Sequence, residues 1–144
     1  MKRTKKNNKG FSLVELIVVV LIMAIIAVAL APQVMKWVNE SRKSADASTY
    51  DSVVAAAQDA LTDEATWNAC ADKKFTIEIS KEGGCVVKEG PDAFNDSFQS
   101  HMGGGNAVKA IKLKQSGITA VVTVDHGTVE RTQEPIADNK KDGE

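Results

Sequence analysis

The chain has 144 residues, of which 43% are hydrophobic and 26% charged, a composition that excludes global disorder and allows one domain with a modest core. Its formal net charge of −1 hides an asymmetry, because the first ten residues hold five of the 18 basic side chains and none of the 19 acidic ones. The rest of the chain is acidic and lacks a basic face to meet phosphates, which argues against nucleic-acid binding.

The first predicted element is a membrane-length helix that follows the basic leader MKRTKKNNKG. Residues Phe11 to Ala31 read FSLVELIVVVLIMAIIAVALA, and only Ser12 and Glu15 interrupt the apolar run. At about 1.5 Å per residue, such a helix spans about 31 Å, the thickness of the hydrocarbon core of a bilayer. Five Lys and Arg residues precede the run and three follow it closely, which favours a cytoplasmic N-terminus and an external body.

Two processing sites are open from composition alone. A secretory signal also has a basic start and an apolar core, but that core is about 7–15 residues long and cleavage follows small residues at its far end. Here the core is longer, and its far end reads AVALAPQ, which allows cleavage after Ala29 or Ala31. The other junction is Lys9-Gly10-Phe11, ahead of the apolar run.

The second junction resembles the N-terminus of a type IV prepilin, in which a short basic leader ends in Gly and is removed at the cytoplasmic face. In the stretch KGFSLVELIVVVLIMAIIA, Gly10 matches the residue before the cut and Phe11 the new N-terminus, which is usually N-methylated. Glu15 matches the fifth residue of the mature chain. Pro32 matches a helix-kinking proline of the family, whereas Ala24 stands where many pilins have glycine.

Glu15 is an acidic residue in the first turn of an otherwise apolar helix. Insertion tolerates it, because the apolar residues contribute about −4 to −8 kcal/mol against a cost of about +3 kcal/mol for one charge. Intramembrane acids usually have a cationic partner, and cleavage before Phe11 would create an amine about one turn away. We therefore interpret Glu15 as the residue that sets the axial register between assembled subunits, as the resemblance also implies. The alternative is a stray carboxylate that reaches toward the headgroups.

The helix is predicted to continue past Pro32 with a kink near Val28 to Pro32, because proline removes a backbone donor and crowds the preceding turn. Beyond it, apolar residues at steps of three and four predict an amphipathic outer half. These residues are Val34, Val38, Ala45, Tyr50, Val53, Val54, Ala57 and Leu61. The polar residues assigned to the other side are Lys36, Asn39, Glu40, Arg42, Lys43, Asp46 and Asp51.

A helix followed by strands predicts an α+β fold, with a long N-terminal helix (transmembrane inner half, amphipathic outer half) packed on a small antiparallel sheet. The resemblance implies the same pilin fold. Alternation and turn residues predict strands at 75–80, 85–88, 107–115, 118–125 and 128–132, and a short helix at 91–102. The expected parts are the leader 1–10, the membrane and assembly half 11–31, the amphipathic half 32–62, the β-rich head 63–132 and a flexible charged tail 133–144.

The segment 62–74 is predicted to be a loop anchored in the core by Trp67 and Cys70. Cys70 and Cys85 would lie in an oxidising compartment, so a disulfide worth about 3 kcal/mol is expected, with two buried free thiols as the alternative. These cysteines, with His101 and His126 far off, lack the spacing of a zinc site, so no metal or cofactor is predicted. Neither histidine has a neighbouring nucleophile, and no catalytic residue or enzyme activity is predicted.

The resemblance implies a structural function. A prepilin cut after Gly10 starts as a single-pass precursor in the cytoplasmic membrane of a bacterium and polymerises into an extracellular filament used for adhesion, motility or related functions. Its implied partners are copies of itself, the prepilin peptidase and N-methyltransferase, and the assembly platform protein with its ATPase. A major pilin is favoured over a pseudopilin of a type II secretion or DNA-uptake system. The alternative from another class is a permanently membrane-anchored extracellular binding protein.

Overall fold

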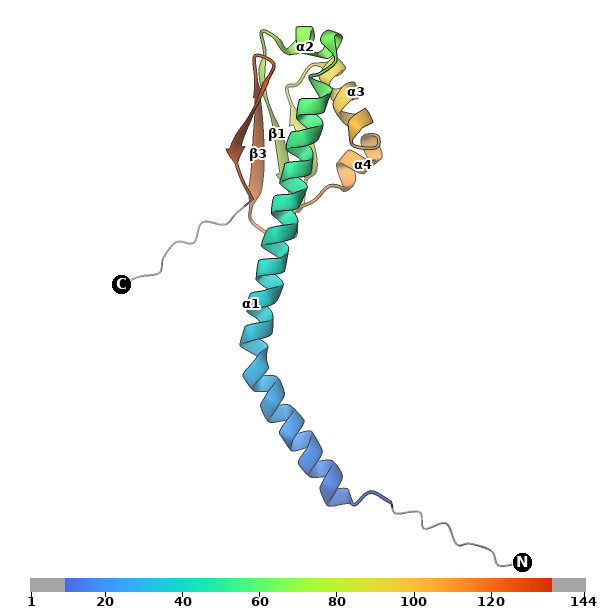
Figure 1. The fold of residues 1–144 in the computed structure, drawn as a ribbon, viewed down its shortest axis with the longest axis vertical. Coiled ribbons are helices and arrows are strands. Elements are labelled where there is room, and N and C mark those ends of the chain that lie inside the picture. Colours follow the sequence, from blue (N-terminus) through green and yellow to red (C-terminus); the bar gives the residue numbers. More distant parts are fainter. Residues whose placement is uncertain (1–9, 136–144) are drawn as a thin grey trace, which may run out of the picture. The chain divides into compact units, whose positions relative to one another are not determined.

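The structure of the chain, a computed structural model, describes residues 10–135. Within that range the elements are α1 (Leu13–Ala60), α2 (Glu64–Cys70), β1 (Lys74–Ser80), β2 (Gly84–Lys88), α3 (Asp92–His101), α4 (Gly105–Ala110), β3 (Thr119–Asp125) and β4 (Thr128–Gln133) (Figure 1). The predicted leader up to residue 9 and the predicted tail from residue 136 lie outside the described residues. The described chain divides into two units between Val38 and Asn39, and α1 contributes to both.

The first unit is the inner part of α1. Pro32 lies inside this helix, which continues to Ala60. From Gly10 to Val38 every residue is exposed, including all the large apolar side chains. The helix therefore forms through its own local hydrogen bonds although many of its residues are β-branched Val and Ile, and its apolar surface finds no partner within the described chain.

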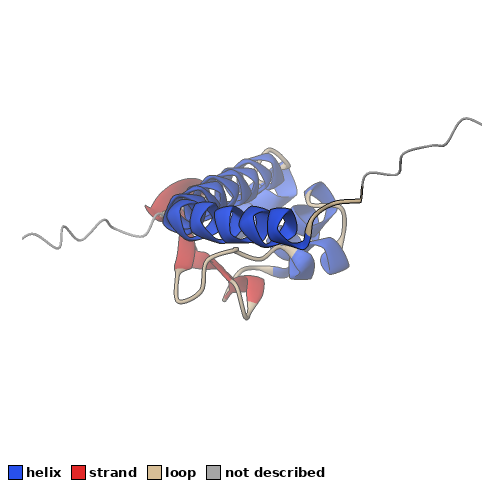
Figure 2. Cartoon of the chain, turned by 90° about the horizontal axis from the view of Figure 1, so that it is seen from below, coloured by secondary structure: helices blue, strands red, loops and turns tan. Residues whose placement is uncertain are grey.

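The second unit is the head, built on a four-stranded antiparallel sheet in the order β2-β1-β3-β4. The register pairs Ile77 of β1 with Val87 of β2 on one side and Val122 of β3 on the other. Strand alternation places these residues on one face, which packs against the outer part of α1. In Figure 2 the strands and the pair α3 and α4 appear on different sides of α1. The predicted α+β fold is confirmed.

The core of the head lies where α1, the sheet and α3 meet. On α1, Tyr50, Val53 and Ala57 are fully buried at helical steps, and the alanine allows the helix to approach the sheet closely. Phe94 and Phe98 of α3 are also fully buried, and their stacked ring centroids are 5.7 Å apart. This packing explains why α3 forms as predicted: its apolar residues, four positions apart, share one face.

The predicted strand at 107–115 is wrong. Residues 105–110 form α4 instead, and residues 111–118 have no regular structure. The reason is that a side chain takes the backbone donors of this segment: Asp46 of α1 accepts hydrogen bonds from the Lys114 amide at 2.5 Å and the Gln115 amide at 3.1 Å. Donors bound to a carboxylate are no longer free to pair with a neighbouring strand.

The predicted loop at 62–74 contains a helix, α2. Asp63 begins it, because its side chain accepts a hydrogen bond from the Thr66 amide at 3.2 Å, as an N-cap residue does. Trp67, expected in the core, is 47% exposed. Its indole lies against the β3–β4 turn, where a Cβ on Gly127 would come within 2.6 Å of Trp67 Nε1. The tryptophan therefore covers the turn rather than filling the core.

The predicted disulfide is not formed: Cys70 and Cys85 are separate, buried thiols. Cys70 lies next to the start of β1, since its carbonyl accepts a hydrogen bond from the Lys73 amide at 3.0 Å. Cys85 pairs with Ile79, near the other end of the same strand. The five steps along β1 from Lys74 to Ile79 rise about 16 Å, well beyond the Cα separation of about 7 Å that a disulfide can bridge.

Candidate assembly site

The candidate site is the start of α1 and the apolar surface that follows it. The helix begins at Leu13, and Glu15 in its first turn turns back so that its Oε2 accepts a hydrogen bond from the Ser12 amide at 2.9 Å. An acidic residue is favourable there, because the first amides of a helix lack partners and its N-terminus carries partial positive charge. Glu15 is thus a local helix cap in the uncut chain.

The expected cleavage junction is open to a second protein. Gly10 has no atom within 4 Å of the place a Cβ would occupy, and Phe11 is 84% exposed. The peptide bond between them precedes α1, so it lies in irregular backbone. An enzyme can bind such a bond in an extended conformation without first unwinding a helix.

The apolar surface of α1 has the length and composition of a membrane span, with a mean hydropathy of 3.2 and none of its most apolar window buried. Side chains at steps of three and four line a shallow groove of about 290 Å³, which has no polar lining. The lining residues are Leu13, Leu16, Ile17, Val20 and Leu21. Both lipid chains and the side chains of a like helix suit this surface.

The other sequence-predicted residues are not gathered with Glu15. Pro32 lies on α1 further along the inner unit, and Ala24 is exposed between them. Cys70 and Cys85 are buried in the core of the head and form no site with Glu15. Within the described residues, the inner unit therefore carries the expected leader junction, one carboxylate and an apolar surface. The two cysteines lie in the head.

The head offers no catalytic centre among the described residues. Burial raises the pKa of the Cys85 thiol to about 12 and also raises that of Cys70, so neither is an activated nucleophile. His101 Nδ1 contacts the Ser97 carbonyl at 2.8 Å, one turn back on α3. The searched part of the chain, residues 10–135, holds no group of three or more His, Cys, Asp and Glu side chains fit for a metal.

The charged pairs on the head hold its strands and helix α1 together. Asp125 accepts a hydrogen bond from Lys74 Nζ at 2.7 Å and also pairs with His126, and these two neighbours hold its carboxyl pKa below the usual range. Arg131 bonds to Asp51 of α1 at 2.6 Å and lies over the Tyr50 ring. These contacts tie β1, β3 and β4 to one another and to α1.

Sequence reasoning missed the role of Asp46. It predicts an exposed residue, whereas the side chain is fully buried and holds the 111–118 segment through two backbone amides. Gln115 Nε2 adds a third bond to the carboxylate at 3.0 Å and also donates to the Pro135 carbonyl at 3.2 Å. One signal was present: Asp46 stands four residues before Tyr50, on the same face of α1.

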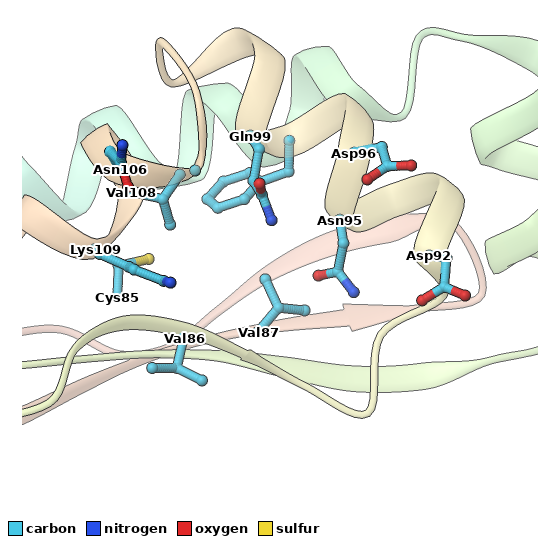
Figure 3. A pocket seen from close by; sticks show the side chains of 12 residues that line it. Cys85, Val86, Val87, Asp92, Asn95, Asp96, Gln99, Asn106, Val108 and Lys109 are labelled. Carbon is cyan, nitrogen blue, oxygen red and sulfur yellow. The ribbon is translucent and has the colours of Figure 1, made fainter.

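A cavity of about 650 Å³ lies between β2, α3 and α4 (Figure 3). Its polar side chains come mainly from one face of α3, and its floor is formed by Val86 and Val87 of β2. The residues on that face of α3 are Asp92, Asn95, Asp96 and Gln99, and Lys109 of α4 stands at the other end. Sequence reasoning did not find this cavity.

Comparison with known proteins identifies a family motif in the segment that contains the candidate site. Residues 5–31 match the family described as the prokaryotic N-terminal methylation motif. The type IV major fimbrial protein FimA of Dichelobacter nodosus is 31% identical over 117 residues, which cover 81% of this chain and 70% of that protein. No solved structure matches the chain significantly. The chain therefore belongs to the type IV pilin family, a family of structural proteins rather than enzymes.

Proposed function

We propose that the chain is the major subunit of a type IV pilus, made as a membrane-anchored precursor and polymerised into an extracellular filament that serves adhesion or motility. The N-terminus lies in the cytoplasm before assembly, and a prepilin peptidase cuts between Gly10 and Phe11 and methylates the new amine. One observation carries the proposal: a fully exposed apolar helix surface with a single carboxylate in its first turn.

Cleavage changes the surroundings of Glu15. In the uncut chain its carboxylate is bonded to the Ser12 amide. After the cut, a charged amine at Phe11 stands about one turn from the same carboxylate, and the amine of a neighbouring copy can approach as closely. Two such charges 4 Å apart attract by about 4 kcal/mol at an effective dielectric of about 20. This attraction exists in one axial register only, whereas a row of Val, Leu and Ile accepts many.

The apolar groove supports packing between like helices. Its lining residues recur at steps of three and four along one face of α1, the pattern of a surface that packs against another helix. The same residues suit lipid while the subunit is anchored. The subunit can therefore move from membrane to filament without changing its surface, because the neighbours replace the lipid.

The name of the matched relative and the extent of the match favour a major subunit over a pseudopilin. The relative is named as a major fimbrial protein, and the similarity runs through the head as well as the N-terminal helix, since it covers 117 residues. Membership of the pilin family suggests that a platform protein and an ATPase supplied by the cell drive assembly.

The test is electron microscopy of filaments sheared from cells that express the chain, with gold-labelled antibody against the head. We expect label along the whole filament length for a major subunit. Label confined to the filament tip, or filaments that persist unlabelled after the gene is deleted, would contradict the proposal. A Gly10→Val variant is the matched negative control, because Gly10 has open space around it and the substitution leaves the chain's own packing unchanged.

A further inference from the structure

Two pairs of like charges stand on different elements of the head. The acidic pair consists of Asp92 and Asp96 of α3, which line the cavity of about 650 Å³ described above. The basic pair consists of Lys112 and Lys114, which line a separate cavity of about 340 Å³ beside α1. All four side chains belong to exposed residues, and none forms an ion pair with another described residue.

The packing of α3 fixes the acidic pair. Phe94 and Phe98 occupy the buried face of this helix, which turns Asp92 and Asp96 toward the cavity and solvent. Residues four apart on a helix have Cβ atoms about 6 Å apart on one face. Figure 3 shows both carboxylates at the same end of the cavity, with Lys109 at the opposite end. That end of the cavity is therefore negatively charged.

The Asp46 anchor fixes the basic pair. Between the two lysines, Leu113 is 2% exposed and points into the core, so Lys112 and Lys114 point outward on either side of it. Ile111, just before them, is extended. Both lysines are exposed residues, so the pair stands on the surface of the head. The Lys114 amide is held by Asp46, which keeps the segment in place.

The two pairs carry opposite charges, and all four residues are exposed on the head. We propose that the acidic pair of one subunit binds the basic pair of the next subunit in the filament, as a contact between heads. This inference rests on the proposed function, since it needs a polymer of this chain. The two surfaces differ, so the contact is heterologous: each copy uses its acidic pair on one neighbour and its basic pair on another, as an open helical filament requires.

A second copy of this chain is favoured over a small ionic ligand as the occupant. Each subunit carries one acidic and one basic pair, so a chain of subunits satisfies every pair without another molecule. A free anion would satisfy only the lysines and a free cation only the aspartates. Complementary charges also exclude wrong registers, because like charges placed opposite each other repel.

The test is charge exchange in the full-length chain, in cells that assemble wild-type filaments. D92K/D96K and K112E/K114E should each lower the yield of sheared filaments by about tenfold or more, because two attractive pairs become repulsive. The four-fold variant that carries both changes should recover to within about threefold of wild type, since the charges are again complementary. D72K/E82K is the control for D92K/D96K, because it makes the same net charge change at exposed residues outside both cavities.

Thermal unfolding of each variant in detergent micelles shows whether the head is intact. If D92K/D96K and K112E/K114E assemble like wild type, or if both fail with intact heads and the four-fold variant does not recover, the contact is disproved. In either case wild-type filaments would still stand as support for the proposed function. Absence of filaments in the wild type would instead overturn the proposed function. A D96C/K114C variant adds a geometric test: oxidised filaments should yield a ladder of cross-linked subunits.

Discussion

The two parts of α1 have similar backbone and opposite surroundings. Residues 13–38 expose every side chain, whereas residues 46–60 bury a face that includes Tyr50, Val53 and Ala57. Both parts are helical, so helix formation here does not depend on burial. What differs is the partner: the outer part has the sheet of its own chain, and the inner part has none within the described residues. The outer part therefore contributes to the folding of the head, and assembly is the role we propose for the inner part.

The largest expected effect is on assembly and comes from the inner part. Glu15→Val should still be processed and inserted, yet lower filament yield by about tenfold or more, since losing 1.4 kcal/mol already corresponds to tenfold. The measurement is the ratio of sheared filament to total subunit. Glu40→Val removes an exposed acid from the same helix and serves as the control. Normal filament yield from Glu15→Val would show that its carboxylate is incidental.

The next effect is on folding and comes from the outer part. Asp46→Leu should destabilise the head by about 2–4 kcal/mol, because the amides of Lys114 and Gln115 lose the buried carboxylate that accepts their hydrogen bonds. Denaturant unfolding of the full chain in detergent micelles measures the change. Asp59→Leu, on the exposed side of α1, should change the free energy of unfolding by less than about 0.5 kcal/mol. Equal effects for the two variants would refute the anchoring role of Asp46.

The same substitution in the two parts of the helix sharpens the comparison directly. Val53→Ala, at a fully buried residue, should cost about 2 kcal/mol of head stability through lost burial and a small cavity. Val20→Ala, at a residue 63% exposed, should leave the unfolding of the head unchanged and lower filament yield instead. Should Val20→Ala destabilise the isolated subunit as much as Val53→Ala does, the division of roles would be wrong.

The smallest effect concerns the only tyrosine in the chain. Burial raises the pKa of Tyr50 above 10.0, although Arg131 acts in the opposite direction. A folded pKa above the unfolded value contributes stability that is present below pH 10 and is lost as the pH rises through the folded pKa. Absorbance of the phenolate in the folded chain should therefore titrate above pH 10, and stability should fall more steeply there than in Tyr50→Phe. A phenolate that titrates below its ordinary pKa would contradict this packing.

The residue pattern was enough to predict the fold class and the positions of all four strands, because alternation at 75–80 and helical steps along α1 are local signals. It failed where a distant side chain decides the local structure. The 107–115 segment has an apolar alternation that fits a strand, but Asp46, far away in sequence, binds its backbone. The prediction of a disulfide was wrong for a related reason. The number of residues between the two cysteines does not show that strand β1 separates them.

The signals for the candidate assembly site are contiguous in sequence, unlike those of the head. Gly10, Phe11 and Glu15 stand within six residues, and the apolar run follows at once. The hydrogen bond between Glu15 and the Ser12 amide was missed, although serine followed three residues later by glutamate before an apolar run is the pattern of a capping box. The cavity beside α3 could not be predicted from the sequence either, because residues of β2, α3 and α4 line it together.

The central claim is that the inner half of α1 begins, in the working protein, at Phe11 with a free or methylated amine beside Glu15. Intact-mass spectrometry of subunits from purified filaments tests it most directly. The account predicts a single species that starts at Phe11, heavier by about 14 Da if methylated. A subunit that retains Met1, or one that starts after Ala31, would contradict it.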